Sequence, residues 1–407
     1  MANPQTHAAQ VAIAGGGMVG LTLALLLARE GVPTLLIERK SKAAMENPVK
    51  DGRAIAIAYG SRRILEGAGA WEGMAPSASP IFDIAVIERN APFHVHYDHR
   101  ELGNEPLGHI VEHDAVLRAL YAAAVKEKAL TILDHAEVAA FDADAYGCRL
   151  TLTDGREVQA KLAVAADGKR SALRAMAGIG VQEKDYKQLA MTCTLACAKP
   201  HDGLAMEKFL PSGPFAALPM LGNRVSIVWT EPKERGESLM RVDEALFMEA
   251  LRERMGDFLG EVTLEGKRHA YPLTFLQARE YIAPRLALAG DAAHAIHPLA
   301  GQGVNLGLRD AAALAELVAA RAKLGLDAGD AALLSRYSRW RRFDALAMIL
   351  ATDGLNTLFS TDFPPLKAAR NLGFGAVNAT KPIKRFLMRH AMGMVGKLPN
   401  VVAKKTA

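Results

Sequence analysis

The pattern of apolar residues at the start of the chain predicts two strands of a parallel sheet with a helix between them. Residues 10–14 form a short apolar run that ends in a glycine cluster, and residues 21–29 are strong helix formers. A Gly-Val-Pro break then leads into a second apolar run at 34–38. Strand, helix and strand within about 30 residues predict a βαβ unit.

Further along the chain the pattern changes. Segments 81–97 and 190–230 alternate apolar and polar residues between many turn residues, which favours strands. The Gly- and Pro-rich stretch 200–223 predicts a loop or the edge of a sheet. Helical patterns cover 108–130, 306–323 and 331–351. This order predicts an α/β fold in which a mostly parallel sheet is interrupted by a β-rich insertion and closed by helices.

Gly15, Gly17 and Gly20 stand between the first strand and its helix with G-x-G-x-x-G spacing. In a βαβ unit the first glycine permits a tight turn, the second lets the backbone approach a pyrophosphate, and the third lets the helix pack closely on the strand. Glu38 ends the second strand, where a carboxylate can bind an adenosine ribose hydroxyl. These residues predict a dinucleotide cofactor, and NAD and FAD are both compatible with them.

A second block lies at the end of the apolar run 286–289. There Gly290 and Asp291 place a carboxylate where it can bind a polyol hydroxyl. The loop and helix start that follow carry four more candidates, Gly301, Gln302, Gly303 and Asn305. Glycines at a helix start expose N–H groups, and these together with the helix dipole can hold an anionic ring such as the N1–C2=O edge of a reduced flavin.

A third block follows the apolar run 162–166. Residues 167–174 read Asp-Gly-Lys-Arg-Ser-Ala-Leu-Arg, a strand–turn–helix with one acid, Asp167, and several cations. A capped helix start in solvent explains this block about as well as a cofactor contact does.

Along the chain the three blocks follow one another as 15–20 with Glu38, then 167–174, then 290–291. In that order they resemble the aromatic-ring flavoprotein monooxygenases of the para-hydroxybenzoate hydroxylase fold. Within that class, residues 297–307, His-Pro-Leu-Ala-Gly-Gln-Gly-Val-Asn-Leu-Gly, resemble the signature of the ubiquinone-biosynthesis hydroxylases, the 2-polyprenylphenol hydroxylase family. Further similarities lie at 51–57, 213–219 and 352–356. The resemblance covers nearly the whole chain.

The resemblance implies that the cofactor is FAD. The three glycines of the first block would hold the FAD diphosphate, and Glu38 would bind the adenosine ribose. Gly290 and Asp291 would bind the ribityl or diphosphate region, and Asp167 would lie near the flavin. The flavin-ring loop would comprise Pro298, Gly301 and Gly303 against the ring, with Gln302 and Asn305 beside them.

Two further residues are cofactor-binding candidates with open alternatives. The resemblance implies that Arg53 approaches the cofactor from the loop after the second strand, and the alternative is a surface cation. His113 stands where the family often has Arg, Gln or Asn. A neutral histidine can still donate one hydrogen bond, so a cofactor contact and a helix-start histidine without a ligand are equal alternatives. No acid or base is assigned.

The activity implied by the resemblance is hydroxylation of the aromatic ring of a polyprenylated phenol in ubiquinone biosynthesis, through a C4a-hydroperoxyflavin formed with O₂. Because only one dinucleotide fingerprint is present, electrons would come from NAD(P)H or a redox partner. Apolar residues 209–220 offer a wall for a prenylated ring. The alternatives are a hydroxylase of another aromatic substrate and a catalytically silent flavoprotein scaffold of a membrane quinone-biosynthesis complex.

The predicted fold class is therefore α/β, with a Rossmann-like FAD-binding domain, an inserted β-rich substrate domain and a helical, basic C-terminal region. The FAD-binding domain is predicted to comprise 1–79, 106–185 and 280–345. The substrate domain is predicted to comprise 80–105 and 186–279, and the C-terminal region 346–407.

Charge is distributed unevenly along the chain. The 407 residues include 49 Lys and Arg against 44 Asp and Glu, but residues 363–407 contain nine basic residues and no acidic one. The remainder is mildly acidic, unlike a uniformly basic nucleic-acid-binding protein, and we expect no nucleic-acid partner. Between Lys381 and Lys397 apolar residues recur at helical spacing among basic ones. This pattern predicts attachment to a membrane surface or a quinone-biosynthesis complex, and its alternative is a helix packed on the body.

The cysteines and the chain start indicate the compartment. Cys148, Cys193 and Cys197 are too few for a disulfide framework. Cys193 and Cys197 share one face of a predicted strand, where buried small apolar residues explain them better than metal ligands, and no metal site is predicted. Without an apolar run that could span a bilayer or a basic signal segment, we expect a cytoplasmic protein, peripheral at the inner face of the membrane.

The second block generates a direct test of FAD binding. Replacing Asp291→Ala should remove a buried hydrogen bond to the cofactor, worth on the order of 1–3 kcal/mol, and raise the Kd for FAD roughly tenfold or more. Titration of the apoprotein with FAD measures this change. A wild-type protein that purifies colourless and cannot be reconstituted with FAD would contradict the assignment.

Overall fold

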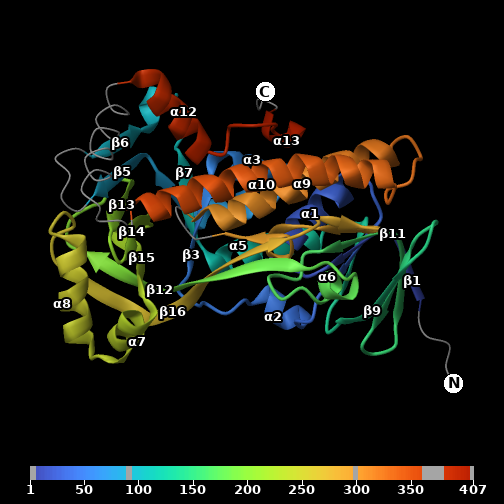
Figure 1. Cartoon of the computed structure of the whole chain (residues 1–407), viewed down its shortest axis with the longest axis horizontal. Coiled ribbons are helices and arrows are strands. Elements are labelled where there is room, and N and C mark those ends of the chain that lie inside the picture. Colours follow the sequence, from blue (N-terminus) through green and yellow to red (C-terminus); the bar gives the residue numbers. More distant parts are fainter. Residues whose placement is uncertain (1–5, 89–93, 297–300, 360–379, 404–407) are drawn as a thin grey trace.

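Two large sheets lie side by side in this chain, and long helices run along them (Figure 1). The computed structural model describes residues 6–88, 94–296, 301–359 and 380–403. Helices α9 (Gln302–Ala322) and α10 (Ala331–Phe359) pack on the core of the first sheet. The predicted α/β class is confirmed.

The first sheet has the strand order β17-β18-β11-β1-β2-β8, and the β9–β10 hairpin extends it beside β11. Its strands are β1 (Thr6–Ala14), β2 (Thr34–Ile37), β8 (Leu130–Leu133), β9 (Val138–Ala143), β10 (Cys148–Leu152), β11 (Glu157–Ala165), β17 (Ile282–Ala283) and β18 (Leu286–Leu288). Strand β1 pairs in parallel with both β2 and β11. Between β1 and β2 runs α1 (Met18–Arg29), which is buried from Gly20 to Ala28 because its residues are apolar nearly all round. The predicted βαβ unit is thus present.

The second sheet has the order β19-β16-β12-β15-β14-β13-β5-β6. Its strands are β5 (Asp83–Glu88), β6 (Val95–Asp98), β12 (Val181–Cys197), β13 (Leu204–Leu210), β14 (Gly213–Met220), β15 (Arg224–Pro232), β16 (Val262–Ala278) and β19 (His294–Ala295). One face packs on α8 (Glu244–Met255), where Phe215, Trp229 and Phe247 meet, and α7 (Lys233–Arg241) lies beside it. Because side chains alternate along a strand, the other face of this sheet is free to line a cavity.

The prediction of a loop or sheet edge at 200–223 is wrong, because β13 and β14 lie inside the second sheet. That prediction rested in part on Pro214 and Pro219, because proline is uncommon inside a sheet. They stand near the two ends of β14, where the missing N–H removes little of the ladder.

A small third sheet, β3-β7-β4, joins the two large ones. It consists of β3 (Ala54–Ala58), β4 (Ala78–Ile81) and β7 (Gly108–Glu112), paired antiparallel. The predicted helix at 108–130 is therefore wrong over its first residues, and α5 begins only at His113 and ends at Ala124. Pairing on both sides of β7 stabilises the strand where the local pattern alone was ambiguous.

The remaining helices are short. They are α2 (Lys42–Glu46), α3 (Tyr59–Gly67), α4 (Trp71–Met74), α6 (Ala172–Met176), α12 (Lys381–Ala391) and α13 (Asn400–Ala403). The predicted domain limits remain a proposal, since β12 and α10 each run across one of them. All three cysteines are free and buried, and Cys193 and Cys197 pack in the apolar core against α8, as predicted. Within the described ranges, no helix is both long and apolar enough to cross a bilayer.

Candidate functional site

The three glycines of the first block lie at the N-terminus of α1. Gly15 has a φ of 105°, and a side chain there would meet Ala166 O at 2.4 Å. A side chain at Gly20 would meet Gly15 O at 1.9 Å, so the helix can approach the strand only with glycine at this position. Gly17, the N-cap of α1, faces open space, and neither a side-chain cap nor an acidic residue occupies the first turn. The backbone N–H groups of this turn are therefore available to an anionic ligand.

Glu38 holds the same turn from the end of β2. Its buried carboxylate accepts the Gly16 N–H through Oε2 at 2.5 Å and the Lys40 N–H through Oε1 at 2.9 Å. Each carboxylate oxygen can accept a second hydrogen bond, so the group can fix the glycine turn and still bind a ribose hydroxyl.

The third block is linked to the second by a contact that sequence reasoning missed. Asp167 Oδ2 accepts the Leu173 N–H at 3.2 Å, whereas Asp167 Oδ1 is buried without a hydrogen-bond partner. Arg174 is buried and donates to Lys169 O and to Ala292 O, both at 2.9 Å. Its guanidinium therefore ties the Asp167 turn to the turn that carries Asp291.

A buried ionic cluster supports the Gly290 turn, and no local sequence pattern predicts it. Gly290 has a φ of 61°, and its N–H donates to Asp310 Oδ2 at 3.0 Å. The same oxygen lies 2.6 Å from His294 Nε2, and Arg341 Nε donates to Asp310 Oδ1 at 2.7 Å. Burial pushes the pKa of Asp310 upward, but the charges and hydrogen bonds of His294 and Arg341 outweigh it and lower the pKa. Asp310 is thus an ionised anchor that links the turn to α9 and α10.

The start of α9 is fixed against β3 by Asn305. Its Oδ1 accepts the Ala58 N–H, and its Nδ2 donates to Ala56 O and Gly301 O, all at 2.9 Å. Gly301 is the N-cap, with a φ of 62°, and a side chain there would meet Ala56 at 2.9 Å. The amide of Asn305 therefore positions the helix start, and any contribution to a cofactor is indirect. Gln302 is buried beside it.

Other predicted residues have different surroundings. Gly303 faces open space, and Asp291 is exposed to the cavity described below. Burial raises the pKa of Asp291, against the opposing effect of the His294 and Lys169 charges. Pro298 lies outside the described residues.

Arg53 and His113 contact each other, and Arg53 lines the cavity described below. Arg53 Nη2 lies 2.5 Å from Asp51 Oδ2 and 3.1 Å from His113 Nδ1. Its guanidinium also lies over the Tyr271 ring, 5.8 Å from the ring centre. Burial and the Arg53 charge lower the pKa of His113 despite the nearby Asp51 carboxylate. Arg53 lines the cavity itself, whereas His113 starts α5 behind it and orients the Arg53–Asp51 pair.

The cavity between the second sheet, the small third sheet and the start of α9 has a volume of about 390 Å³. One side is formed by Arg53, Asp291, Gly301, Gly303 and neighbouring residues of β3 and α9. The opposite side, here called the sheet wall, comprises Ala190, Thr192, Ala205, Glu207, Pro214, Ala216, Leu218, Ser226, Val228 and Thr230. Most of its surface is apolar, which suits a substrate with an apolar body.

The prediction of an apolar wall at 209–220 is only half right. Strand alternation turns Pro214, Ala216 and Leu218 into the cavity, whereas Phe215 packs into the core with Trp229. Thr192 Oγ1, on the sheet wall, is buried without a hydrogen-bond partner.

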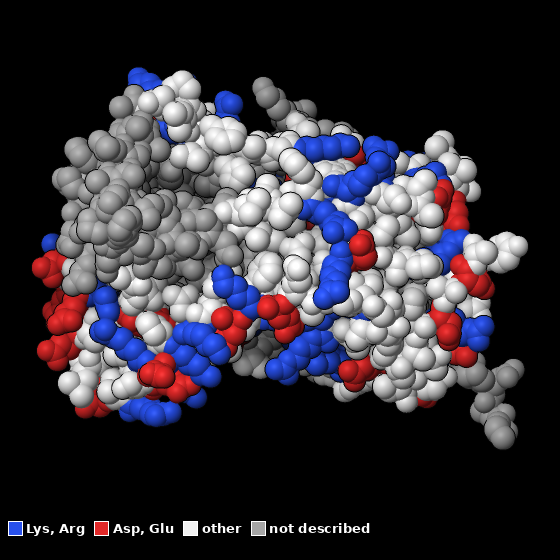
Figure 2. Space-filling view, viewed as in Figure 1, with Lys and Arg blue, Asp and Glu red and all other residues white. Residues whose placement is uncertain are grey.

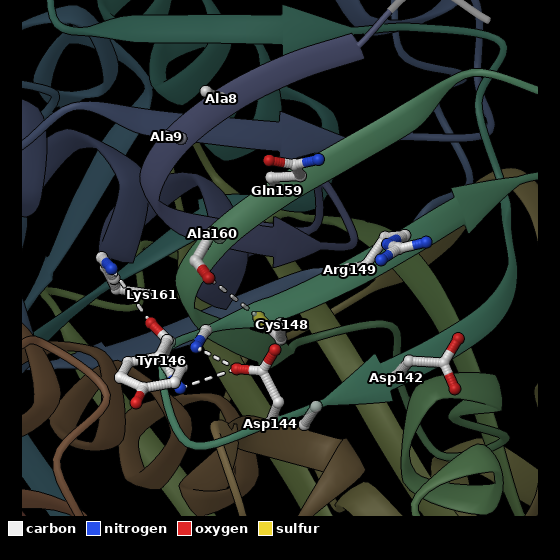
Figure 3. A pocket seen from close by; sticks show the side chains of 12 residues that line it. Ala8, Ala9, Asp142, Asp144, Tyr146, Cys148, Arg149, Gln159, Ala160 and Lys161 are labelled. Atoms are coloured by element: carbon white, nitrogen blue, oxygen red, sulfur yellow. Dashed lines mark hydrogen bonds between the residues drawn. The ribbon is translucent and has the colours of Figure 1, made fainter.

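A second hollow, of about 470 Å³, lies in the outer part of the first sheet and is shown in Figure 3. It is lined by Asp142, Arg149 and Gln159, which are paired across β9, β10 and β11, and by Ala8 of β1. This hollow lies at the amino ends of β1 and β11. Ligands of open parallel sheets bind at the carboxyl ends, where the glycine turn is, so this hollow is not part of the cofactor site.

Comparison with known proteins assigns the family. The model of the FAD binding domain family matches residues 8–351. The chain belongs to this family of FAD-dependent monooxygenases. It is 44% identical to Ubiquinone hydroxylase UbiL of Rhodospirillum rubrum over 95% of this chain and 90% of that protein. It is also 35% identical to 3-demethoxyubiquinol 3-hydroxylase of Escherichia coli, over 95% and 98%. The family of ubiquinone-biosynthesis hydroxylases suggested by the sequence motifs is thus confirmed.

A solved structure gives the same fold. The crystal structure of p-nitrophenol 4-monooxygenase PnpA from Pseudomonas putida superposes on this chain with a TM-score of 0.78. The match covers 95% of this chain and 98% of that one, at 22% sequence identity.

The residues of the site fit FAD. Gly17 and Gly303 leave open space where a diphosphate and a flat ring can approach the backbone, and Asp167 Oδ1 is a buried acceptor in need of a donor. A ribityl hydroxyl or a flavin N–H is such a donor.

The ionic cluster yields a prediction about cofactor affinity. The substitution Asp310→Asn removes the negative charge that balances Arg341. It also weakens the hydrogen bond that the side chain at position 310 accepts from the Gly290 N–H. We expect the Kd for FAD to rise roughly tenfold and the free energy of unfolding to fall by about 3 kcal/mol, since one partner of a buried ion pair is lost. Cofactor titration and urea unfolding measure the two effects. Asp257→Asn, at an exposed position, is the control, and equal behaviour of the two variants would disprove the anchoring role.

Proposed function

We propose that this enzyme hydroxylates the aromatic ring of a polyprenylated phenol in ubiquinone biosynthesis. The observation that carries the proposal is the cavity, in which the apolar sheet wall faces Asp291 and the Gly301–Gly303 start of α9. The relatives named ubiquinone hydroxylase and 3-demethoxyubiquinol 3-hydroxylase match along nearly the whole chain and support the same substrate class.

The residues around the cavity have separable tasks in this reaction. FAD, when bound, would supply the reducing equivalents and activate O₂, with electrons from NAD(P)H or a redox partner. The α1 N-terminus would bind the diphosphate, Glu38 the ribose and Asp291 the ribityl region. The start of α9 would place unhindered N–H groups against the flavin ring, and the sheet wall would orient the phenol and exclude water.

Activity and substrate can be tested together. We expect purified protein with FAD and NAD(P)H to consume O₂ in step with hydroxylation of a short-chain prenylphenol, measured by an oxygen electrode and mass spectrometry. In a strain lacking the gene, the accumulating precursor identifies the ring position. Hydroxylation of non-prenylated aromatics alone would favour the alternative substrate class. A flavoprotein that consumes no O₂ with any phenol, under donors and partners tested in turn, would favour the scaffold.

We also propose that the enzyme is peripheral at the cytoplasmic face of the membrane, where a polyprenyl phenol resides, and that α12 makes the contact. One face of α12 packs on the body through Met388, and Met392, which directly follows the helix, is buried as well. Lys384 pairs with Glu101. The other face exposes Ile383 and Phe386, which are 47% and 56% exposed.

Arg385 and Arg389 are exposed on the same helix, α12, at the upper left in Figures 1 and 2. Elsewhere on the face shown in Figure 2, Lys and Arg are interspersed with Asp and Glu. Exposed apolar side chains flanked by cations are typical of helices that lie in a membrane interface.

Co-sedimentation with anionic liposomes tests this contact. Because Met388 and Met392 belong to the core, point substitutions are preferable to truncation. We expect less sedimentation at low salt from either of two double variants, Ile383→Ser with Phe386→Ser and Arg385→Glu with Arg389→Glu. Each basic residue near the membrane surface contributes roughly 1 kcal/mol to the binding free energy. Leu324→Ser, at a residue 73% exposed in a turn, should have no effect. Sedimentation that does not depend on α12 would refute the assignment.

A further inference from the structure

The cavity can hold the ring of the proposed substrate but not its whole tail. Its volume of about 390 Å³ lies near the lower end of the range typical of pockets for drug-sized ligands. A tail of several isoprene units therefore has to leave the cavity. Because transfer of hydrocarbon out of water is favourable, we expect it to leave where the apolar surface continues.

The two ends of the cavity differ in polarity. Tyr271 on β16 and Ile84 on β5 both line it and stand near opposite edges of the second sheet. At the Tyr271 end, the Arg53 guanidinium lies over the tyrosine ring and pairs with Asp51. At the other end, beside β4 and β5, apolar residues line the cavity, namely Ile81, Ile84, Ala205 and Leu218. The apolar end suits a hydrocarbon tail.

Strand register extends this apolar end to the edge of the second sheet. Ile84 pairs with Ala205 of β13 on one side and with Tyr97 of β6 on the other. Directly paired residues share a face of the sheet, so the face that lines the cavity continues past Ile84 to the Tyr97 ring. Burial and, after it, the Glu207 charge raise the pKa of Tyr97 to about 12. Glu207 stands in the next row along β13, so the apolar path follows the row of Ile84.

Helix α12 covers this path, and it lies beside β6 in Figure 1. Met388 of the helix and Met392, which directly follows it, are buried in the apolar cluster that also contains Ile84 and Tyr97. Met220 belongs to the same cluster. Methionine side chains are unbranched and flexible, so this layer can rearrange around a hydrocarbon chain.

The two ends of α12 are held differently. At the C-terminal end, the Gly60 N–H donates to Met392 O at 2.8 Å. At the N-terminal end, the first turn is exposed and Lys384 pairs with Glu101. An exposed turn opens more easily than a segment that is buried and hydrogen-bonded. The N-terminal half of α12 can therefore lift while its C-terminal end stays in place.

We propose that the polyprenyl tail of the substrate binds between the second sheet and α12, over Ile84 and Tyr97 and beneath Met388. This assignment rests on the proposed function. The ring remains in the cavity, and the tail emerges at the N-terminal half of α12, which also carries the exposed Ile383 and Phe386. The ring can thus reach the cofactor side while the end of the tail stays in the bilayer.

A substitution in the methionine layer tests the path with two phenols that share one ring. One carries a single isoprene unit and the other a tail of several units. We expect Met388→Trp to lower kcat/KM for the long-tailed phenol roughly tenfold or more, because the larger side chain fills the path. For the short-tailed phenol the change should stay within about twofold. Met388→Leu conserves the volume and should behave as wild type.

Met176→Trp, at an exposed position on α6, is the matched control and should change neither value. FAD content and urea unfolding of Met388→Trp should match those of wild type. An equal loss for both phenols, or wild-type values for both, would overturn the tail path and leave the proposed function standing. If wild type hydroxylates only aromatic compounds without a prenyl group, the proposed function itself is wrong, and the tail path falls with it.

Photo-cross-linking of wild type locates the tail without any substitution, and it decides the question if Met388→Trp does not fold. The probe is the long-tailed phenol with a diazirine in the middle of its tail, and mass spectrometry identifies the labelled peptides. We expect label in the peptides that contain Tyr97 or Met388. Label confined to the peptides around Arg53 and Tyr271 would overturn the assignment.

Discussion

The fully buried Asp310 carboxylate is the interaction on which the arrangement of the cofactor site depends. It stands on α9, accepts the Gly290 N–H and contacts His294, while Arg341 of α10 balances its charge. The turn that presents Asp291 and the helix whose start faces the cavity are therefore held in one rigid unit. A charge in this position is tolerated only because each of its oxygens is paired.

Close backbone packing is the second constraint on the site. Gly20 lets α1 approach Gly15 O, and Gly307 lets α9 approach Gly290 and Val19. Both helices thus meet at the Gly290 turn near their N-terminal ends, and neither has a side chain that caps its first turn. Two helix N-termini directed to one region suit a cofactor with an anionic diphosphate and a ring that becomes anionic on reduction.

The second sheet has two faces with different roles: one packs into an apolar core, and the other forms the sheet wall of the cavity. Its strands place Phe215 and Trp229 against α8, and they place Ala216, Val228 and Glu207 against the cavity. The same alternation that stabilises the sheet therefore sets the polarity of the substrate side, residue by residue. Small and branched side chains on this wall leave room for a ligand.

The sequence by itself determined the α/β class, the βαβ unit, the candidate residues of the glycine turn and the likeness to the hydroxylase family, because these depend on local spacing and periodicity. The prediction of helix at 108–112 and of a loop or sheet edge at 200–223 was wrong. In both segments pairing with distant strands outweighs the local conformational preference. Only the tertiary structure brought Asp310 to Gly290, Arg174 to Ala292 and His113 to Arg53. These contacts join residues that lie 20, 118 and 60 positions apart. No local pattern in a sequence indicates which buried polar groups will meet.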